Sequence, residues 1–278
     1  MSVLTGERIK VIQVEMHVTH SCNLACEACT HFSNEIYSGR ETPDSFRTSL
    51  QPWTERLMPS HFLLLGGEPT LNPDLCEILE VARELWPEVA SMMLVTNGWF
   101  LKRHPRLPEV LKRTKIHLDV SIHYDSPEYT AKLAEIEDTC GEWGIPIRWR
   151  PSFKDWTRYY QGAGVDAAPF EDADPRSSWN HCDSRHCLTI HEGRLWKCPP
   201  LAYLPMHVEK YGDKDGKWAP YLAYRALEPT ATLEQVKDFV NRKVEHFCSM
   251  CPAKPQPFRK ADPLLRINLP TGKEKVQP

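Results

Sequence analysis

Five short apolar segments alternate with stretches of helical character in the first half of the chain, and this alternation constrains the fold more than any other feature. The segments are Val11–Val18, His61–Leu65, Met92–Val95, Ile116–Ile122 and Ile145–Trp149. Strands that are separated by helices form parallel sheets through right-handed crossovers. The sequence therefore predicts an α/β fold, a partial (β/α)6 TIM-like barrel of which five units can be placed, in which chemistry lies where the strands end.

Three segments carry further signals of local structure. A helix is expected after the second strand, with Asn72 as its N-cap and Pro73 at its first position. The stretch from Pro127 to Trp143 is also expected to be helical, whereas residues 154–181 are rich in Gly, Ala, Asp and Pro and look like a loop. A capping box at Thr232–Gln235 predicts a helix near the C-terminus. Its expected apolar face consists of Leu233, Val236, Val240, Val244 and Phe247.

The composition is that of a soluble globular protein. Of the 278 residues 41% are hydrophobic and 26% charged, and the formal net charge of −3 does not indicate binding to nucleic acid. No apolar run is long enough to span a membrane, and the N-terminus lacks the apolar core of a signal peptide. We therefore expect a cytoplasmic protein, in which the ten cysteines bind metal more readily than they form disulfides.

Three cysteines lie close together directly after the first expected strand. Cys22, Cys26 and Cys29 have the spacing C-x3-C-x2-C. Three thiolates on one loop can bind three irons of a cubane cluster and leave the fourth iron open, as a catalytic metal centre requires. The alternative from the residues alone is a zinc knuckle, completed by one of three neighbouring histidines: His17, His20 or His31.

This spacing resembles the radical S-adenosylmethionine (SAM) superfamily. The resemblance implies a [4Fe-4S] cluster on the three cysteines, whose open iron binds SAM. Reductive cleavage of SAM then gives a 5′-deoxyadenosyl radical that abstracts hydrogen from a carbon atom of the substrate. An external reductant such as flavodoxin or ferredoxin is implied as a partner.

Other motifs resemble the SAM-binding residues of that family. Gly66-Gly67-Glu68 follows the second strand and resembles the GGE motif, whose acid holds the SAM ammonium group. Asn97 follows the third strand and either contacts the SAM ribose or caps a turn. Ser121 ends the fourth strand and is implied as a further SAM contact. Two arginines of the fifth strand, Arg148 and Arg150, share one face by alternation. They point either to solvent or into the barrel, where Arg150 would meet the SAM carboxylate or an anionic substrate group.

A second group of cysteines lies in the C-terminal part. Cys182, Gly193 and Cys198 have the spacing C-x10-G-x4-C, and a C-x2-C pair follows later. The first part of this pattern includes an expected hairpin of Leu188–Ile190 and Leu195–Lys197. The pattern resembles the twitch domain, the short form of the SPASM domain. It implies a second [4Fe-4S] cluster on four cysteines: Cys182, Cys198, Cys248 and Cys251. Spacing alone also allows structural zinc.

Cys187 is the fifth cysteine of that region. It is then either a hydrogen-atom donor to a substrate radical, a small buried residue, or a ligand in place of Cys182. The resulting division is a radical SAM barrel over residues 1–181, a twitch-type domain over 182–253 and a proline-rich basic tail over 254–278.

The expected substrate is a small molecule, with neither nucleic acid nor membrane as a partner. The small architecture, with no leader-peptide-binding domain expected, is similar to radical SAM dehydrogenases of aminocyclitols and to radical SAM epimerases. We therefore expect dehydrogenation or epimerisation of a sugar or aminocyclitol in natural-product or carbohydrate biosynthesis. The alternatives are modification of a ribosomal peptide and, more remotely, a non-catalytic zinc-binding module.

Overall fold

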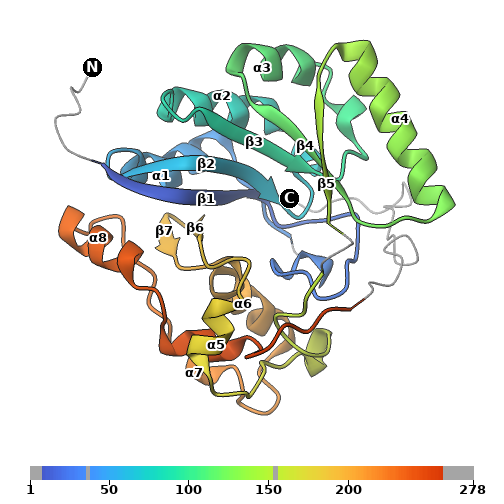
Figure 1. The fold of residues 1–278 in the computed structure, drawn as a ribbon. Helices are drawn as coiled ribbons and strands as arrows, with labels where there is room; N and C mark the ends of the chain where they lie inside the picture. Colours follow the sequence, from blue (N-terminus) through green and yellow to red (C-terminus); the bar gives the residue numbers. More distant parts are fainter. Residues whose placement is uncertain (1–7, 36–37, 153–155, 259–278) are drawn as a thin grey trace.

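A seven-stranded sheet organises the molecule (Figure 1). The computed structural model describes residues 8–35, 38–152 and 156–258. The strand order is β5-β4-β3-β2-β1-β6-β7. The strands are β1 (Ile9–Thr19), β2 (Leu57–Gly66), β3 (Ser91–Thr96), β4 (His117–Ile122), β5 (Ile147–Pro151), β6 (Cys187–His191) and β7 (Arg194–Trp196).

The five predicted parallel strands are confirmed, and a sixth parallel strand comes from the predicted hairpin. β6 pairs in parallel with β1, and β7 pairs antiparallel with β6. β1 therefore lies between β2 and β6, with the strands β2 to β5 on one side of it and β6 and β7 on the other. The carboxyl ends of β1, β2 and β6 meet at one edge, as expected for a partial barrel.

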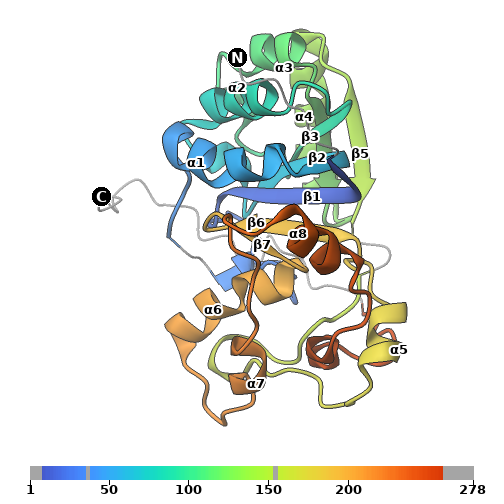
Figure 2. The same cartoon turned by 90° about the vertical axis from the view of Figure 1, so that its left-hand side faces the viewer.

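Four helices follow the first strands and cover the outer face of the sheet. These are α1 (Pro43–Thr54), α2 (Leu75–Leu85), α3 (Leu107–Thr114) and α4 (Pro127–Trp143). Four further helices lie below the sheet on the side of β6 and β7 in Figures 1 and 2. These are α5 (Pro175–Asn180), α6 (Pro199–Tyr211), α7 (Ala219–Leu222) and α8 (Leu233–Asn241).

The alternation of apolar and polar residues along β1 gives the sheet one apolar face and one polar face. Val14, Met16 and Val18 are at most 1% exposed and join Phe46 and Trp53 of α1 in the core. The residues between them are polar and lie on the inner face of the strand, because side chains alternate along a strand. The inner face is therefore available for chemistry, while the outer face stabilises the fold.

The predicted N-cap of the helix after β2 is wrong. α2 begins at Leu75, because residues 69–71 first form a 3-10 turn. The Asn72 side chain instead donates hydrogen bonds to the carbonyl oxygens of Val18 (2.7 Å) and Glu41 (2.8 Å). It thus ties the end of β1 to the segment that leads into α1.

The predicted capping box of α8 is confirmed, but its apolar face is partly wrong. Thr232 Oγ1 accepts from the Gln235 backbone at 3.3 Å, and the Gln235 side chain accepts from the Thr232 backbone at 2.8 Å. Leu233 is 44% exposed, whereas Val236 and Phe239 are at most 1% exposed. Phe239, which the pattern did not include, therefore belongs to the buried face, and Leu233 does not.

Other boundaries differ from the sequence-based expectation. α8 ends before Val244 and Phe247, which were expected to extend its face. α1, α3, α5, α6 and α7 were not predicted, and α5 lies in the segment 154–181 that was expected to be a loop. α6 carries an internal proline, Pro205. Of the tail predicted from residue 254, only residues 254–258 lie within the described ranges. No helix in the described ranges is long and apolar enough to cross a bilayer.

Candidate active site

The first three cysteines line a cavity at the carboxyl ends of the strands. Cys22, Cys26 and Cys29 lie on the loop that leaves β1, and the cavity that they share has a volume of about 260 Å³. Trp156, which also lines the cavity, holds the loop through its Nε1, which donates to the Glu27 carbonyl oxygen at 3.0 Å. The three thiols therefore belong to one site, as their spacing predicts.

Two glycines let the end of β2 approach this loop. Gly67 N donates to the Thr19 carbonyl oxygen at 2.9 Å, and Glu68 N donates to the Ser21 carbonyl oxygen at 2.8 Å. A Cβ atom on Gly66 would lie 2.2 Å from the Thr19 oxygen, and one on Gly67 would lie 2.1 Å from the Ser21 oxygen. Because these oxygens belong to the backbone, only glycine fits at either position.

Glu68 is fully buried and does not line the cavity. Its Oε1 accepts from the backbone (2.9 Å) and hydroxyl (2.6 Å) of Thr70 and from the Thr96 hydroxyl, and its Oε2 accepts from Asn97 N at 2.7 Å. Burial raises the pKa of the carboxyl group, while the hydrogen bonds with Thr70 and Thr96 lower it. The carboxylate ties the end of β2 to the end of β3, and its contact with SAM stays a prediction.

Asn97, Ser121 and Arg150 line the same cavity. The Asn97 side chain donates to Asn23 Oδ1 at 2.8 Å and accepts from the Trp99 backbone at 3.1 Å. It thus connects the cysteine loop with the turn after β3, which supports the turn-capping role, and its contact with the SAM ribose stays a prediction.

The two arginines of β5 share a face, and their partner is a residue that the sequence analysis missed. Asp119 of β4 lies 3.4 Å from Arg148 Nε and 3.6 Å from Arg150 Nη1. Burial raises the pKa of this carboxyl group, and the two arginines lower it. The signal was present in the sequence, because Asp119 precedes Ser121 by two residues and so shares its face.

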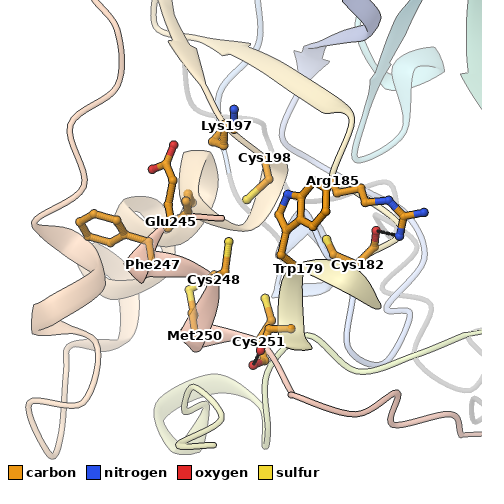
Figure 3. Close-up of a pocket in the computed structure, with 12 residues that line it drawn as sticks. Trp179, Cys182, Arg185, Lys197, Cys198, Glu245, Phe247, Cys248, Met250 and Cys251 are labelled. Carbon is orange, nitrogen blue, oxygen red and sulfur yellow. Dashed lines mark hydrogen bonds between the residues drawn. The ribbon is translucent and has the colours of Figure 1, made fainter. Parts of the chain in front are cut away.

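The second group of cysteines surrounds another cavity (Figure 3). Cys182 follows α5, Cys198 precedes α6, and Cys248 and Cys251 follow α8. Figure 3 shows their sulfur atoms directed toward a common space. Burial raises the pKa of Cys182 to about 12 and raises that of Cys198 and Cys251 as well. Four desolvated thiols that converge in this way form a donor set for iron or zinc.

Cys187 is not part of that set. It lies at the start of β6, lines the first cavity, and its Sγ is 2.9 Å from Gln13 Nε2. All ten cysteines lie in the described ranges, and none forms a disulfide.

The histidines considered as zinc ligands lie in an aromatic cluster beside β1. His17 stacks on Tyr203 with ring centroids 4.0 Å apart, and its Nδ1 is 3.1 Å from His20 Nδ1. Burial lowers the pKa of His17 and, together with His191, brings that of His20 to about 4. No three His, Cys, Asp or Glu side chains of the described residues are placed to hold a single metal ion.

His31 differs from the other histidines of that cluster. Its Nε2 lies 3.2 Å from Oε1 of the buried Glu15. Burial alone would lower the pKa of His31, but Glu15 and Cys29 outweigh it and raise it to about 10. Glu15 is a second acid that the sequence analysis missed.

The family model described as the radical SAM superfamily matches residues 16–141. Residues 16–141 form a radical SAM domain. Domains of this family bind SAM and an iron–sulfur cluster, and the matched region contains the Cys22–Cys29 loop, the Gly66-Gly67-Glu68 turn and Asn97. The second group of cysteines lies outside the matched region.

Curated relatives of the radical SAM domain have several different activities. A putative glycyl-radical enzyme activating enzyme of Methanocaldococcus jannaschii is 28% identical over 38% of this chain and 38% of its own length. A probable GTP 3′,8-cyclase of Pyrococcus horikoshii is 35% identical over 32% of this chain and 27% of its own length. The matches thus span less than half of these relatives.

Solved structures with a radical SAM arrangement are more distant. BtrN in complex with AdoMet and 2-DOIA has a TM-score of 0.47 and 14% identity over 88% of this chain and 94% of that chain. anSMEcpe with bound AdoMet has a TM-score of 0.39 and 16% identity over 51% of this chain and 43% of that chain. Likeness at this level carries no information on substrate.

Proposed function

We propose that this protein is a radical SAM enzyme that abstracts a hydrogen atom from a carbon of a small polar metabolite, a sugar or aminocyclitol. One observation carries the proposal: a single cavity brings the cysteine loop, the Gly66-Gly67 turn and the thiol of Cys187 together from distant parts of the chain. The product is an epimer or a dehydrogenated metabolite. The same proposal places the protein in the cytoplasm, where flavodoxin or ferredoxin would reduce it.

The residues around the first cavity fit the cofactors of the family. Cys22, Cys26 and Cys29 would hold a [4Fe-4S] cluster, and Asn97, Ser121 and Arg150 line the space beside them. When bound, cluster and SAM supply the 5′-deoxyadenosyl radical. The backbone groups at Gly66 and Gly67 shape the wall against which SAM would lie.

A second [4Fe-4S] cluster on Cys182, Cys198, Cys248 and Cys251 is part of the proposal. These side chains line one cavity, and four thiolates are the usual ligand set of a [4Fe-4S] cluster. The shared cavity supports a cluster and a twitch-type unit over residues 182–253, between the barrel (1–181) and the tail (254–278).

The position of Cys187 favours epimerisation over dehydrogenation. Burial raises the pKa of the thiol, and the charge of Glu15 raises it further. The sulfur therefore keeps its hydrogen at neutral pH, which is the form that can return a hydrogen atom to a substrate radical. One electron from the external reductant and a proton from solvent would then convert the resulting thiyl radical back to the thiol. Dehydrogenation is the second candidate, because a cluster in the four-cysteine cavity could accept the electron that such a reaction releases.

The proposed function is tested by anaerobic reconstitution with iron and sulfide. The holoprotein is expected to contain about eight irons and, with dithionite, to convert SAM to 5′-deoxyadenosine. The substrate is then sought in a panel of sugars and aminocyclitols that accelerate 5′-deoxyadenosine formation. No cleavage of SAM, or stoichiometric zinc beside about four irons, would contradict the corresponding part of the proposal.

Cys187→Ala is expected to abolish epimerisation and leave SAM cleavage intact. The assay is run in deuterated water with the substrate from that panel, and the wild-type product should carry one solvent deuterium. Cys140→Ala, which alters a cysteine buried in α4, is the matched control. Loss of iron from the variant would make Cys187 a ligand, and oxidation at the normal rate would favour dehydrogenation.

A further inference from the structure

We propose that Glu15 is a substrate-binding residue, whose second carboxylate oxygen accepts a hydrogen bond from a hydroxyl or amino group of a polyhydroxylated ring. This rests on the proposed function, because it takes the cavity of the radical SAM domain as the substrate site. Neither the cysteine motifs nor the SAM-binding motifs include this residue.

Glu15 is placed in the cavity by the alternation of β1. The strand presents Gln13 and Glu15 on its inner face, and both line the cavity. In the sheet, Glu15 lies opposite Leu63 of β2 and Thr189 of β6. The residue is 3% exposed, so its carboxylate depends on protein or ligand atoms for hydrogen bonds.

Only one of the two oxygens has partners. Oε1 accepts from Thr189 Oγ1 at 3.2 Å and lies 3.2 Å from His31 Nε2. Among the described residues none donates to Oε2. Leu63, its neighbour on β2, is apolar and has no donor to offer. Because Glu15 lines the cavity and its Oε2 has no donor among the described residues, a ligand in the cavity can supply one.

The wall around Glu15 indicates the chemistry of that ligand. Gln13 pairs with Cys187 across β1 and β6, so an amide, a carboxylate and a thiol lie side by side on this wall. The Gly66-Gly67 turn lies at the end of β2, after Leu63 and Leu65, and Asn97 follows the end of β3. The β1–β6 wall is therefore the part of the cavity that remains for the substrate once SAM lies against that turn.

Charge narrows the substrate class further. The Glu15 carboxylate on this wall repels a phosphate or carboxylate group of a ligand. A ring with several hydroxyl groups satisfies Oε2, and an amino group does so equally. An apolar ligand would leave Oε2 without a partner, which sites of this kind reject strongly.

The test measures binding rather than turnover. Reconstituted holoprotein is saturated with SAM without reductant, and scyllo-inositol and 2-deoxystreptamine are titrated by calorimetry. Wild-type protein is expected to bind at least one of the two. Glu15→Gln should weaken that binding about 10- to 100-fold, as expected for a lost charge-assisted hydrogen bond. The Kd of SAM and the iron content should not change.

Two further variants separate substrate binding from folding. Glu41→Gln makes the same chemical change in a half-buried acid outside the cavity, whose carboxylate accepts from Ser45 at the start of α1. It should bind the ring as wild-type protein does. Glu15→Asp keeps the charge but withdraws the oxygen, and should weaken binding with full iron content.

Three results would overturn the inference. Equal binding by wild-type and Glu15→Gln protein would exclude a role in recognition. Binding of neither ring by wild-type protein that binds SAM would exclude the substrate class. A Glu15→Gln variant that loses affinity for SAM alone would make Glu15 a SAM ligand. If wild-type holoprotein neither binds nor cleaves SAM, the proposed function itself fails, and that outcome is distinct from the other three.

Discussion

Joint replacement of Cys22, Cys26 and Cys29 by alanine is expected to abolish the conversion of SAM to 5′-deoxyadenosine, a loss of at least about 100-fold. The three thiols line one cavity beside the Gly66-Gly67 turn, and no other cysteines of the chain lie on that loop. Iron should fall from about eight to about four per chain. The measurements are chromatography of the nucleoside product and iron analysis.

A double variant of the remaining buried cysteines controls for the general effect of removing thiols. Cys76 and Cys140 are buried in α2 and α4, away from both cavities. Their joint replacement by alanine should leave SAM cleavage and iron content near wild-type values. Cleavage that persists in the triple variant would refute the assignment of the cluster to this loop.

Replacement of Cys248 and Cys251 by alanine is expected to have the second-largest effect. The variant should lose about four irons and unfold at a lower temperature, because metal binding there joins segments that follow α5, precede α6 and follow α8. Its first cavity is unaltered, so SAM cleavage without substrate should continue. Product formation from a metabolite should be lost.

Metal analysis and a thermal scan decide the outcome of that experiment. Cys187→Ala serves as the comparison. Because Cys187 lies outside the four-cysteine cavity, this variant should keep all of its irons. A double variant with unchanged iron and an unchanged melting temperature would contradict the second cluster. Loss of one zinc instead of four irons would identify a structural zinc site.

The strands could be predicted because each is a short apolar run that ends in a turn or polar signal. α1 was missed although Phe46, Leu50 and Trp53 follow helical spacing, since its polar surroundings and internal Pro52 resemble a loop. α6 begins with two prolines and contains a third, which local rules treat as a break. Tertiary packing outweighs these local preferences.

The edge at which β6 joins the sheet could not be predicted. Local patterns identify a hairpin but do not say which strand will accept it, and in the structure β1 accepts it at the edge opposite β2. The spacing of the cysteines could be read from the sequence, whereas the direction in which Cys187 points could not. Cys187 points into the first cavity because β6 pairs with β1, which places Cys187 beside Gln13.

Glu15 and Asp119 illustrate a different limit. Both could have been found by alternation, because Gln13 and Glu15 interrupt an apolar strand at every second position. Asp119 and Ser121 do the same on β4. The pattern shows that these residues share a face, but only the assembled sheet shows that the face lines a cavity or meets two arginines.

The Gly66-Gly67-Glu68 turn has an evolutionary consequence. Both glycines are required by backbone atoms of the cysteine loop, and Glu68 is held by donors within the protein. All three residues would therefore persist under selection for folding alone. A homologue that had lost its catalytic cysteines would still carry this tripeptide, so the tripeptide marks common descent. Under the proposed function, the cysteines would distinguish a working enzyme from a pseudoenzyme.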